Sequence, residues 1–139
     1  MKVQDVMTSS VEWVSPETKV VDVAKLMKRD DVGSIPICQG NSLIGIVTDR
    51  DIVLKVVATG GNTNNTLVKD TMSTDIISVS ADQDVHEAAN LMSKYQIRRL
   101  PVLDKGRLVG IVSLGDLAVE KMHINEAGDA LSDISQDYH

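Results

Sequence analysis

Apolar residues recur with a helical period in two stretches of the chain. The positions i, i+3, i+4 and i+7 are apolar in two sets, Val20, Val23, Ala24 and Met27, and then Val85, Ala88, Ala89 and Met92. This spacing places each set on one face of an amphipathic helix. Ser15 and Ser80 precede the two sets and are suited to N-cap the helices, while Glu17 and Asp82 suit the positive end of the helix dipole. The pattern predicts two equivalent helices, each capped by a serine.

Short β-favouring segments flank these helices. "VEWVS" and "IISVS" come before them, and two pairs of apolar runs come after them, "SIPIC" with "LIGIVT" and "RLPVL" with "RLVGIVS". The separators "QGNS" and "DKG" are typical of hairpin turns. A second helix follows, whose predicted apolar side consists of Ile52, Val53, Val56 and Val57 in the first copy and of Leu114, Leu117 and Ala118 in the second. Each half of the chain is therefore predicted as strand, helix, hairpin, helix.

The two halves are an internal repeat. Residues 2–52 align with residues 67–117 without a gap, at a constant offset of 65, and the matched pairs include Met7 with Met72, Pro36 with Pro101 and Asp51 with Asp116. Between them, "ATGGNTNNT" has the composition of a loop. We predict an α/β fold of the α+β type, with two β-α-β-β-α repeats at 1–57 and 67–122. The linker is 58–66, and the tail 123–139 has apolar spacing that suits a short helix.

Composition narrows the classes of function. The net charge is -6 with a sequence pI near 4.9, and the chain has two tyrosines and one tryptophan, so little favours a nucleic-acid binder. No run reaches the roughly 18 apolar residues that a membrane span needs, and the N-terminus does not have the apolar core of a signal peptide. We expect a cytoplasmic protein with no nucleic-acid or membrane partner.

Few residues suggest reaction chemistry. Cys38 stands alone in an apolar run and is predicted to be a small buried hydrophobe, and Met27 and Met92 are predicted to fill the core. The three histidines show no metal-ligand spacing. No Gly-rich phosphate loop, HExxH motif or nucleophile with its base is evident, so we expect neither a metal nor enzymatic activity.

The most informative motif occurs twice, as "GIVTDRD" and "GIVSLGD". Thr48 precedes Asp51 by three residues, as Ser113 precedes Asp116, just before a predicted helix. One reading is a capping box, in which hydroxyl and carboxylate bind each other's backbone N–H groups. The other is a nucleotide site, in which the helix start attracts phosphate and the carboxylate accepts both ribose hydroxyls. Local physics alone favours the cap.

The paired repeats, each with an apolar-Pro strand ("SIPI", "RLPV") and a Gly-apolar-Val-Thr/Ser-x-x-Asp end, resemble tandem CBS domains of the cystathionine β-synthase type. The resemblance extends from about residue 3 to residue 118 and is strongest to small stand-alone bacterial CBS-pair proteins. It implies two repeats packed about a pseudo-twofold axis, with clefts for adenosine-containing ligands such as AMP, ATP or S-adenosylmethionine. It also implies a regulatory homodimer that acts on a target protein the sequence does not name, with no cofactor required.

Carried over by position, the resemblance assigns ribose to Asp51 and Asp116, with Thr48 and Ser113 beside the ribose or phosphate. The segments Ile35-Pro36 and Leu100-Pro101 would line the adenine cleft.

In relatives a basic residue before the apolar-Pro pair often reaches phosphate. Arg98 and Arg99 occupy that place in the second repeat and Gly33 and Ser34 in the first, although two solvated arginines are an equally good interpretation. If the arginines cross the central interface, they and Arg50 would make the Asp51 cleft the stronger phosphate site.

Two alternatives stay open beside a ligand sensor. One is a structural or protein-interaction module whose motifs are only caps. The other is a small enzyme, which we do not expect.

Overall fold

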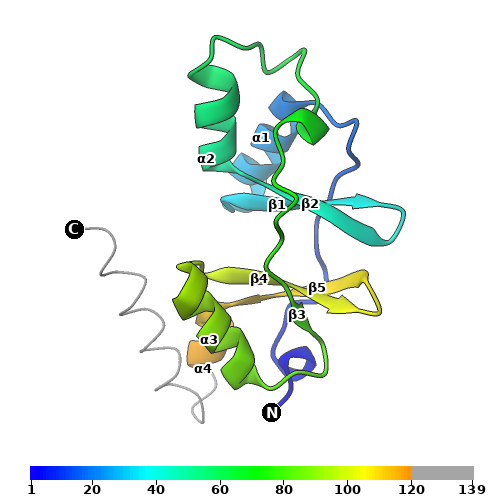
Figure 1. Ribbon diagram of the computed structural model, residues 1–139, viewed down its shortest axis with the longest axis vertical. Coiled ribbons are helices and arrows are strands. Elements are labelled where there is room, and N and C mark those ends of the chain that lie inside the picture. The colour runs from blue at the N-terminus through cyan, green and yellow to red at the C-terminus, as the bar shows by residue number, and fades with distance from the viewer. Residues whose placement is uncertain (120–139) are drawn as a thin grey trace, which may run out of the picture. The chain divides into compact units, whose positions relative to one another are not determined.

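The computed structural model describes residues 1–119, which form two compact units, and the predicted tail at 123–139 lies outside them. One unit is Glu12–Ile76. The other combines Met1–Val11 with residues 77–119. In each unit, two helices lie on the same side of a β-hairpin (Figure 1).

The unit 12–76 has α1 (Val20–Asp30), β1 (Ser34–Gln39), β2 (Ser42–Thr48) and α2 (Asp49–Ile52), then a π-helical turn η2 (Val53–Val57) and a 3-10 helix η3 (Val68–Asp70). The other unit has η1 (Val3–Asp5), β3 (Val79–Ser80), α3 (Val85–Tyr95), β4 (Arg99–Asp104), β5 (Arg107–Ser113) and α4 (Leu114–Val119). This order confirms the predicted mixed α/β class and the repeated helix-hairpin-helix. The pseudo-twofold packing of the repeats stays a prediction.

Both predicted hairpins are confirmed, and they match in detail. β1 pairs antiparallel with β2, and β4 with β5, and each register shifts at the same place, after Ile37 in one hairpin and after Val102 in the other. The tight turns use positive φ angles, 63° at Gly40 in the first and 53° and 80° at Lys105 and Gly106 in the second. The repeat therefore extends to the irregularities of the strands.

The strands predicted before the helices are shorter than expected. In "VEWVS" only Val14 pairs, through an isolated parallel bridge to Ile37, and in "IISVS" only β3 pairs, parallel to β4. The backbone N–H of Val14 donates to Pro36 and that of Cys38 donates to Val14, so the contact is one ladder step long. Trp13, beside Val14, is 45% exposed and lies outside the core.

The predicted N-caps Ser15 and Ser80 are wrong. The helices begin at Val20 and Val85, with Lys19 and Asp84 at the cap positions, and only Asp84 caps with its side chain, accepting from the N–H of His86. Each serine instead opens a turn, because its carbonyl accepts from the N–H three residues later, at Thr18 or Gln83. The helices start where the first valine enters the core, which is a tertiary constraint that local capping preferences do not contain.

The apolar faces of α1 and α3 are confirmed. Seven of the eight predicted positions are buried in the main clusters, whereas Ala24 is half-buried at the edge of its cluster. The cores contain Val20, Val23, Met27, Ile35, Ile37 and Val47 in one unit and Val85, Ala88, Met92, Leu100, Val102 and Val112 in the other. Cys38 is buried as predicted, and burial raises the pKa of its thiol.

The predicted apolar side of the second helices is partly wrong. Ile52, Val56, Leu114 and Leu117 are buried, whereas Val53 and Val57 are 53% and 58% exposed and Ala118 is exposed. The helix widens to π geometry over Val53–Val57, and the N–H of Ala58 donates to the carbonyl of Val53. A short helix on the surface turns one narrow stripe to the core, so the neighbouring apolar residues face outward.

The compact units do not coincide with the sequence repeats, because the first segment of each repeat belongs to the unit of the other repeat. Thr8, from the start of the first repeat, bridges to Ile111 in β5, and Ser73, from the start of the second, bridges to Ile46 in β2. The methionines of these segments lie on the motif glycines, because a Cβ on Gly45 would be 2.5 Å from Sδ of Met72 and one on Gly110 would be 2.5 Å from Sδ of Met7. The glycine of each "GIV" therefore makes room for the exchanged segment.

Candidate functional site

Both copies of the Thr/Ser-x-x-Asp motif form a complete capping box. The N–H of Asp51 donates to Oγ1 of Thr48 at 3.0 Å, and the N–H of Thr48 donates to Oδ2 of Asp51 at 2.9 Å. In the second copy the N–H of Asp116 donates to Oγ of Ser113 at 3.0 Å, and the N–H of Ser113 donates to Oδ2 of Asp116 at 2.8 Å. The capping interpretation is confirmed, and it uses one oxygen of each carboxylate.

Each motif sits at the junction of a hairpin and a helix. Thr48 and Ser113 are the last residues of β2 and β5, and they pair with Ser34 and Arg99 at the start of the neighbouring strands. The first helical N–H groups donate back across the same junction, from Asp49 to Gly33 at 2.9 Å and from Leu114 to Arg98 at 2.8 Å. Both carboxylates are half-buried, so they are held firmly yet remain accessible.

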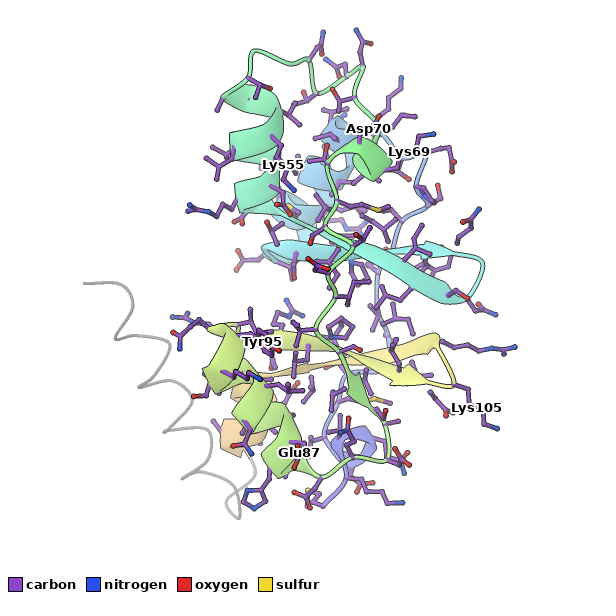
Figure 2. The ribbon with its side chains drawn as sticks, viewed as in Figure 1. Lys55, Lys69, Asp70, Glu87, Tyr95 and Lys105 are labelled. Carbon is purple, nitrogen blue, oxygen red and sulfur yellow. The ribbon has the colours of Figure 1, made fainter. Side chains whose placement is uncertain are left out.

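The second oxygens of the two carboxylates have different surroundings. Oδ1 of Asp51 lies 3.3 Å from Nζ of Lys55, one helical turn later, and the same ammonium donates to the carbonyl of Thr71 at 3.1 Å. Figure 2 shows Lys55 on its helix, on the side of the segment that carries Lys69 and Asp70. Within residues 1–119, no group donates to Oδ1 of Asp116. One carboxylate is therefore engaged through both oxygens and the other through one.

The predicted phosphate-binding arginines are exposed. Arg98 and Arg99 adjoin the Ser113–Asp116 motif of their own unit through the backbone, and none of the three guanidiniums, Arg50 included, has an ion pair or hydrogen bond with another group in residues 1–119. The binding of phosphate by Arg98 and Arg99 at the Asp51 motif stays a prediction. Around Asp51 the chain adds a second acid, Asp49, where the other copy has Leu114.

The apolar-Pro segments are buried in their own units. Ile35 and Leu100 are 2% and 0% exposed and belong to the two cores, and Pro36 and Pro101 are also buried. Their role in holding adenine stays a prediction.

Lys55 is the residue near the motifs that the sequence interpretation missed. Its spacing of four residues after Asp51 on a predicted helix was the available signal, because residues i and i+4 are neighbours on a helix surface. Among residues 1–119, no three His, Cys, Asp or Glu side chains converge as a metal site would require. None of the helices in this part of the chain is both long and apolar enough to cross a membrane.

Comparison with known proteins adds the family. The model of the CBS domain matches residues 3–58 and again residues 68–123. The CBS domain-containing protein YhcV of Bacillus subtilis is 45% identical over 133 residues, covering 96% of this chain and 94% of its own.

Two solved structures are informative about ligands. The crystal structure of Hypoxic Response Protein I, with two coordinated zinc ions, is 35% identical, covers 86% of this chain and 98% of its own, and has a TM-score of 0.80. A CBS domain pair in complex with 5-methylthioadenosine and S-adenosyl-L-methionine is 28% identical, covers 86% of this chain and 94% of its own, and has a TM-score of 0.73. A relative named Hypoxic response protein 1 comes from Mycobacterium tuberculosis.

Proposed function

The chain belongs to the CBS-domain family, with two such domains in tandem, and on this basis we propose that it is a regulatory module that binds an adenosine-containing ligand. The observation that carries the proposal is the pair of Thr/Ser-x-x-Asp caps. Each holds a half-buried carboxylate at a hairpin-helix junction through one oxygen, with backbone geometry that agrees between the copies to 0.1 Å in both hydrogen bonds.

The chemistry of ribose suits such a carboxylate. The 2′- and 3′-hydroxyls lie side by side and both donate, and an ionised carboxylate accepts only, with two oxygens and about four lone-pair sites. The cap fixes the side chain before any ligand arrives, so little ordering is needed on binding. Complexes of a relative with two adenosine derivatives support the choice of adenosine over other ribosides.

In this proposal Asp51 and Asp116 accept ribose, Thr48 and Ser113 lie beside the ribose or phosphate, and Ile35-Pro36 and Leu100-Pro101 hold adenine. Arg98, Arg99 and Arg50 bind phosphate when the ligand carries it, as in AMP or ATP. The output is a change in conformation or assembly, which a ligand produces by binding one of two states more tightly. The chain then acts on another protein and catalyses no reaction, as is general for small stand-alone CBS proteins.

One observation favours a second function, a protein-interaction or homodimer module without a nucleotide. Val53, Leu54 and Val57 expose 53%, 49% and 58% of their surface within the π-helical turn Val53–Val57. Adjacent exposed aliphatic side chains are typical of a protein contact. This module and the sensor are compatible, because a sensor that signals by assembly needs a contact surface.

Thermal unfolding with a ligand panel tests the proposal. The panel is AMP, ADP, ATP, S-adenosylmethionine, cyclic di-AMP, NADH, GTP and Zn²⁺, each with wild type, Asp51→Ala/Asp116→Ala and the matched control Asp75→Ala/Asp104→Ala. A ligand at 100 times its dissociation constant stabilises the native state by about 2.7 kcal/mol, which raises Tm by several degrees in a chain of this size.

A shift with an adenine ligand that only the Asp51→Ala/Asp116→Ala variant loses would support the sensor. An absence of shifts with every adenine ligand, together with an intact oligomer, would leave the motifs as caps and favour the interaction module.

A further inference from the structure

One lysine gives the carboxylates of Asp51 and Asp116 different surroundings. Nζ of Lys55 lies 3.3 Å from Oδ1 of Asp51 and donates to the carbonyl of Thr71 at 3.1 Å. The Asp51 side chain is 18% exposed and that of Lys55 is 48% exposed, so the ammonium engages the second oxygen of a half-buried acid. The other oxygen, Oδ2, is already used by the cap.

The second repeat does not have the lysine of this arrangement. At the offset of 65 residues, Glu120 stands in place of Lys55. A glutamate carboxylate has no proton to donate to Asp116. Oδ1 of Asp116 accordingly has no donor within residues 1–119, while Oδ2 is bound by the cap as in the first repeat.

A ribose diol needs the oxygen that Lys55 occupies. Two hydroxyl donors must reach one carboxylate, and the cap leaves Oδ1 as the freer acceptor. At Asp116 the diol binds an open oxygen. At Asp51 the diol must share Oδ1 with an ammonium or displace it, and displacement breaks the ion pair.

We propose that Lys55 is a specificity-determining residue that holds Asp51 in an ion pair and so leaves the Ser113–Asp116 motif as the first of the two to accept ribose. The inference rests on the proposed adenosine-binding function and deepens it, because it gives an order to the two sites. It also reverses the expectation that the Asp51 motif is the stronger one.

Neighbouring charges also favour the Asp116 motif over the Asp51 motif for a phosphorylated ligand. Asp49 adds a second carboxylate at the start of the Asp51 helix, where Leu114 stands in the other copy. The Oδ1 atom of Asp49 accepts from the N–H of Arg50 at 2.8 Å. Arg98 and Arg99 meanwhile adjoin the Asp116 motif within their own unit.

Titration calorimetry with AMP, ATP and S-adenosylmethionine tests the order. The variants are Asp51→Asn and Asp116→Asn, which keep a side-chain acceptor for the cap, and Lys55→Met, which keeps the length of the lysine without its charge. Lys25→Met is the matched control, because Lys25 is an exposed lysine of the same unit that forms no ion pair within residues 1–119. A second probe, 2′,3′-dideoxyadenosine monophosphate, has no diol.

We expect Asp116→Asn to weaken the tighter binding step more than tenfold, because it removes the acceptor charge of a charge-assisted hydrogen bond. Asp51→Asn should leave that step within about threefold. Lys55→Met should strengthen the weaker step about two- to fivefold, the amount that an exposed ion pair contributes. Lys25→Met should change neither step, and the dideoxy probe should not distinguish wild type from Lys55→Met.

Three outcomes would overturn the inference while the adenosine function stands. They are loss of the tighter step in Asp51→Asn, weaker binding in Lys55→Met, and equal gains in Lys55→Met and Lys25→Met. Absence of heat and of thermal shifts with all three ligands in wild type would instead remove the proposed function, and the order of sites with it.

Discussion

Asp51 and Asp116 have matching capping boxes and different neighbouring side chains. Their capping hydrogen bonds agree to 0.1 Å, yet one carboxylate is paired with Lys55 and preceded by Asp49, and the other has Leu114 and an open oxygen. The duplicated motif fixes the position of the carboxylate. Side chains one helical turn away, which the motif does not include, then change the surroundings of that carboxylate.

The largest expected effect tests the shared part of this comparison, the two cores. Ile52 and Leu117 are equivalent positions, 7% and 0% exposed. Substitution of either by alanine should lower the free energy of unfolding by about 2 to 5 kcal/mol, because a cavity is added to the lost burial. Leu54→Ala, at a 49% exposed neighbour, should cost less than about 0.5 kcal/mol. Denaturant unfolding measures the free energy of unfolding of all three variants. A small loss in Leu117→Ala would contradict the equivalence of the cores.

Substitution of the motif glycines, Gly45 and Gly110, should lower stability by different amounts in the two repeats. A Cβ on Gly110 would lie 2.9 Å from the carbonyl oxygen of Thr8, whereas the backbone atom nearest a Cβ on Gly45 is the carbonyl oxygen of Ser73 at 3.2 Å. Overpacking costs about 1 to 3 kcal/mol, and backbone yields less than a methionine side chain.

Gly110→Ala should therefore destabilise the protein more than Gly45→Ala. Combination with Met72→Ala should partly rescue Gly45→Ala, and combination with Met7→Ala should rescue Gly110→Ala less. Equal costs and equal rescue in thermal unfolding would show that the backbone contact of Gly110 does not matter.

The two capping boxes should contribute similar amounts to stability. Thr48→Ala and Ser113→Ala each remove one side-chain acceptor for a helical N–H, which should cost about 0.5 to 2 kcal/mol. Thr48→Ser and Ser113→Thr keep the hydroxyl and are the controls. A cost confined to one repeat, measured by urea unfolding, would mean that one motif is not held by its cap.

The smallest effect concerns the helix ends and has the opposite sign. Asp31 and Gln96 follow α1 and α3 in the left-handed region, with φ of 54° and 57°, where glycine has no Cβ penalty. Asp31→Gly should stabilise by up to about 1 kcal/mol. Gln96→Gly should gain less, because Nε2 of Gln96 donates to the carbonyl of Ser93 at 2.8 Å. Asn90→Gly, inside α3, is the control and should lose stability, and a stabilised control would contradict the argument from φ.

Sequence reasoning predicted what is local and repeated. The hairpins, the faces of α1 and α3, buried Cys38 and the reciprocal bonds of both caps follow from periodicity and spacing. It missed what depends on residues far apart in the chain. The helices start at Val20 and Val85 because those valines enter the core, and Gly45 and Gly110 are needed because Met72 and Met7 arrive from exchanged segments.

The errors at the second helices have the same origin. Val53 and Val57 are apolar and correctly spaced, and only packing shows that Ile52 and Val56 take the inner side. Lys55 was within reach of the i, i+4 rule, but its second bond, to Thr71, needed the fold.

The unequal carboxylates can be tested most directly by following backbone amides of uniformly ¹⁵N-labelled wild type during a titration with AMP, and with S-adenosylmethionine if AMP causes no shifts. We predict that the amides of Ser113 and Asp116 reach saturation first, and that those of Thr48 and Asp51 shift only at higher ligand concentration. Earlier or simultaneous saturation at Thr48 and Asp51 would contradict the claim that Lys55 disfavours ribose binding at the Asp51 motif.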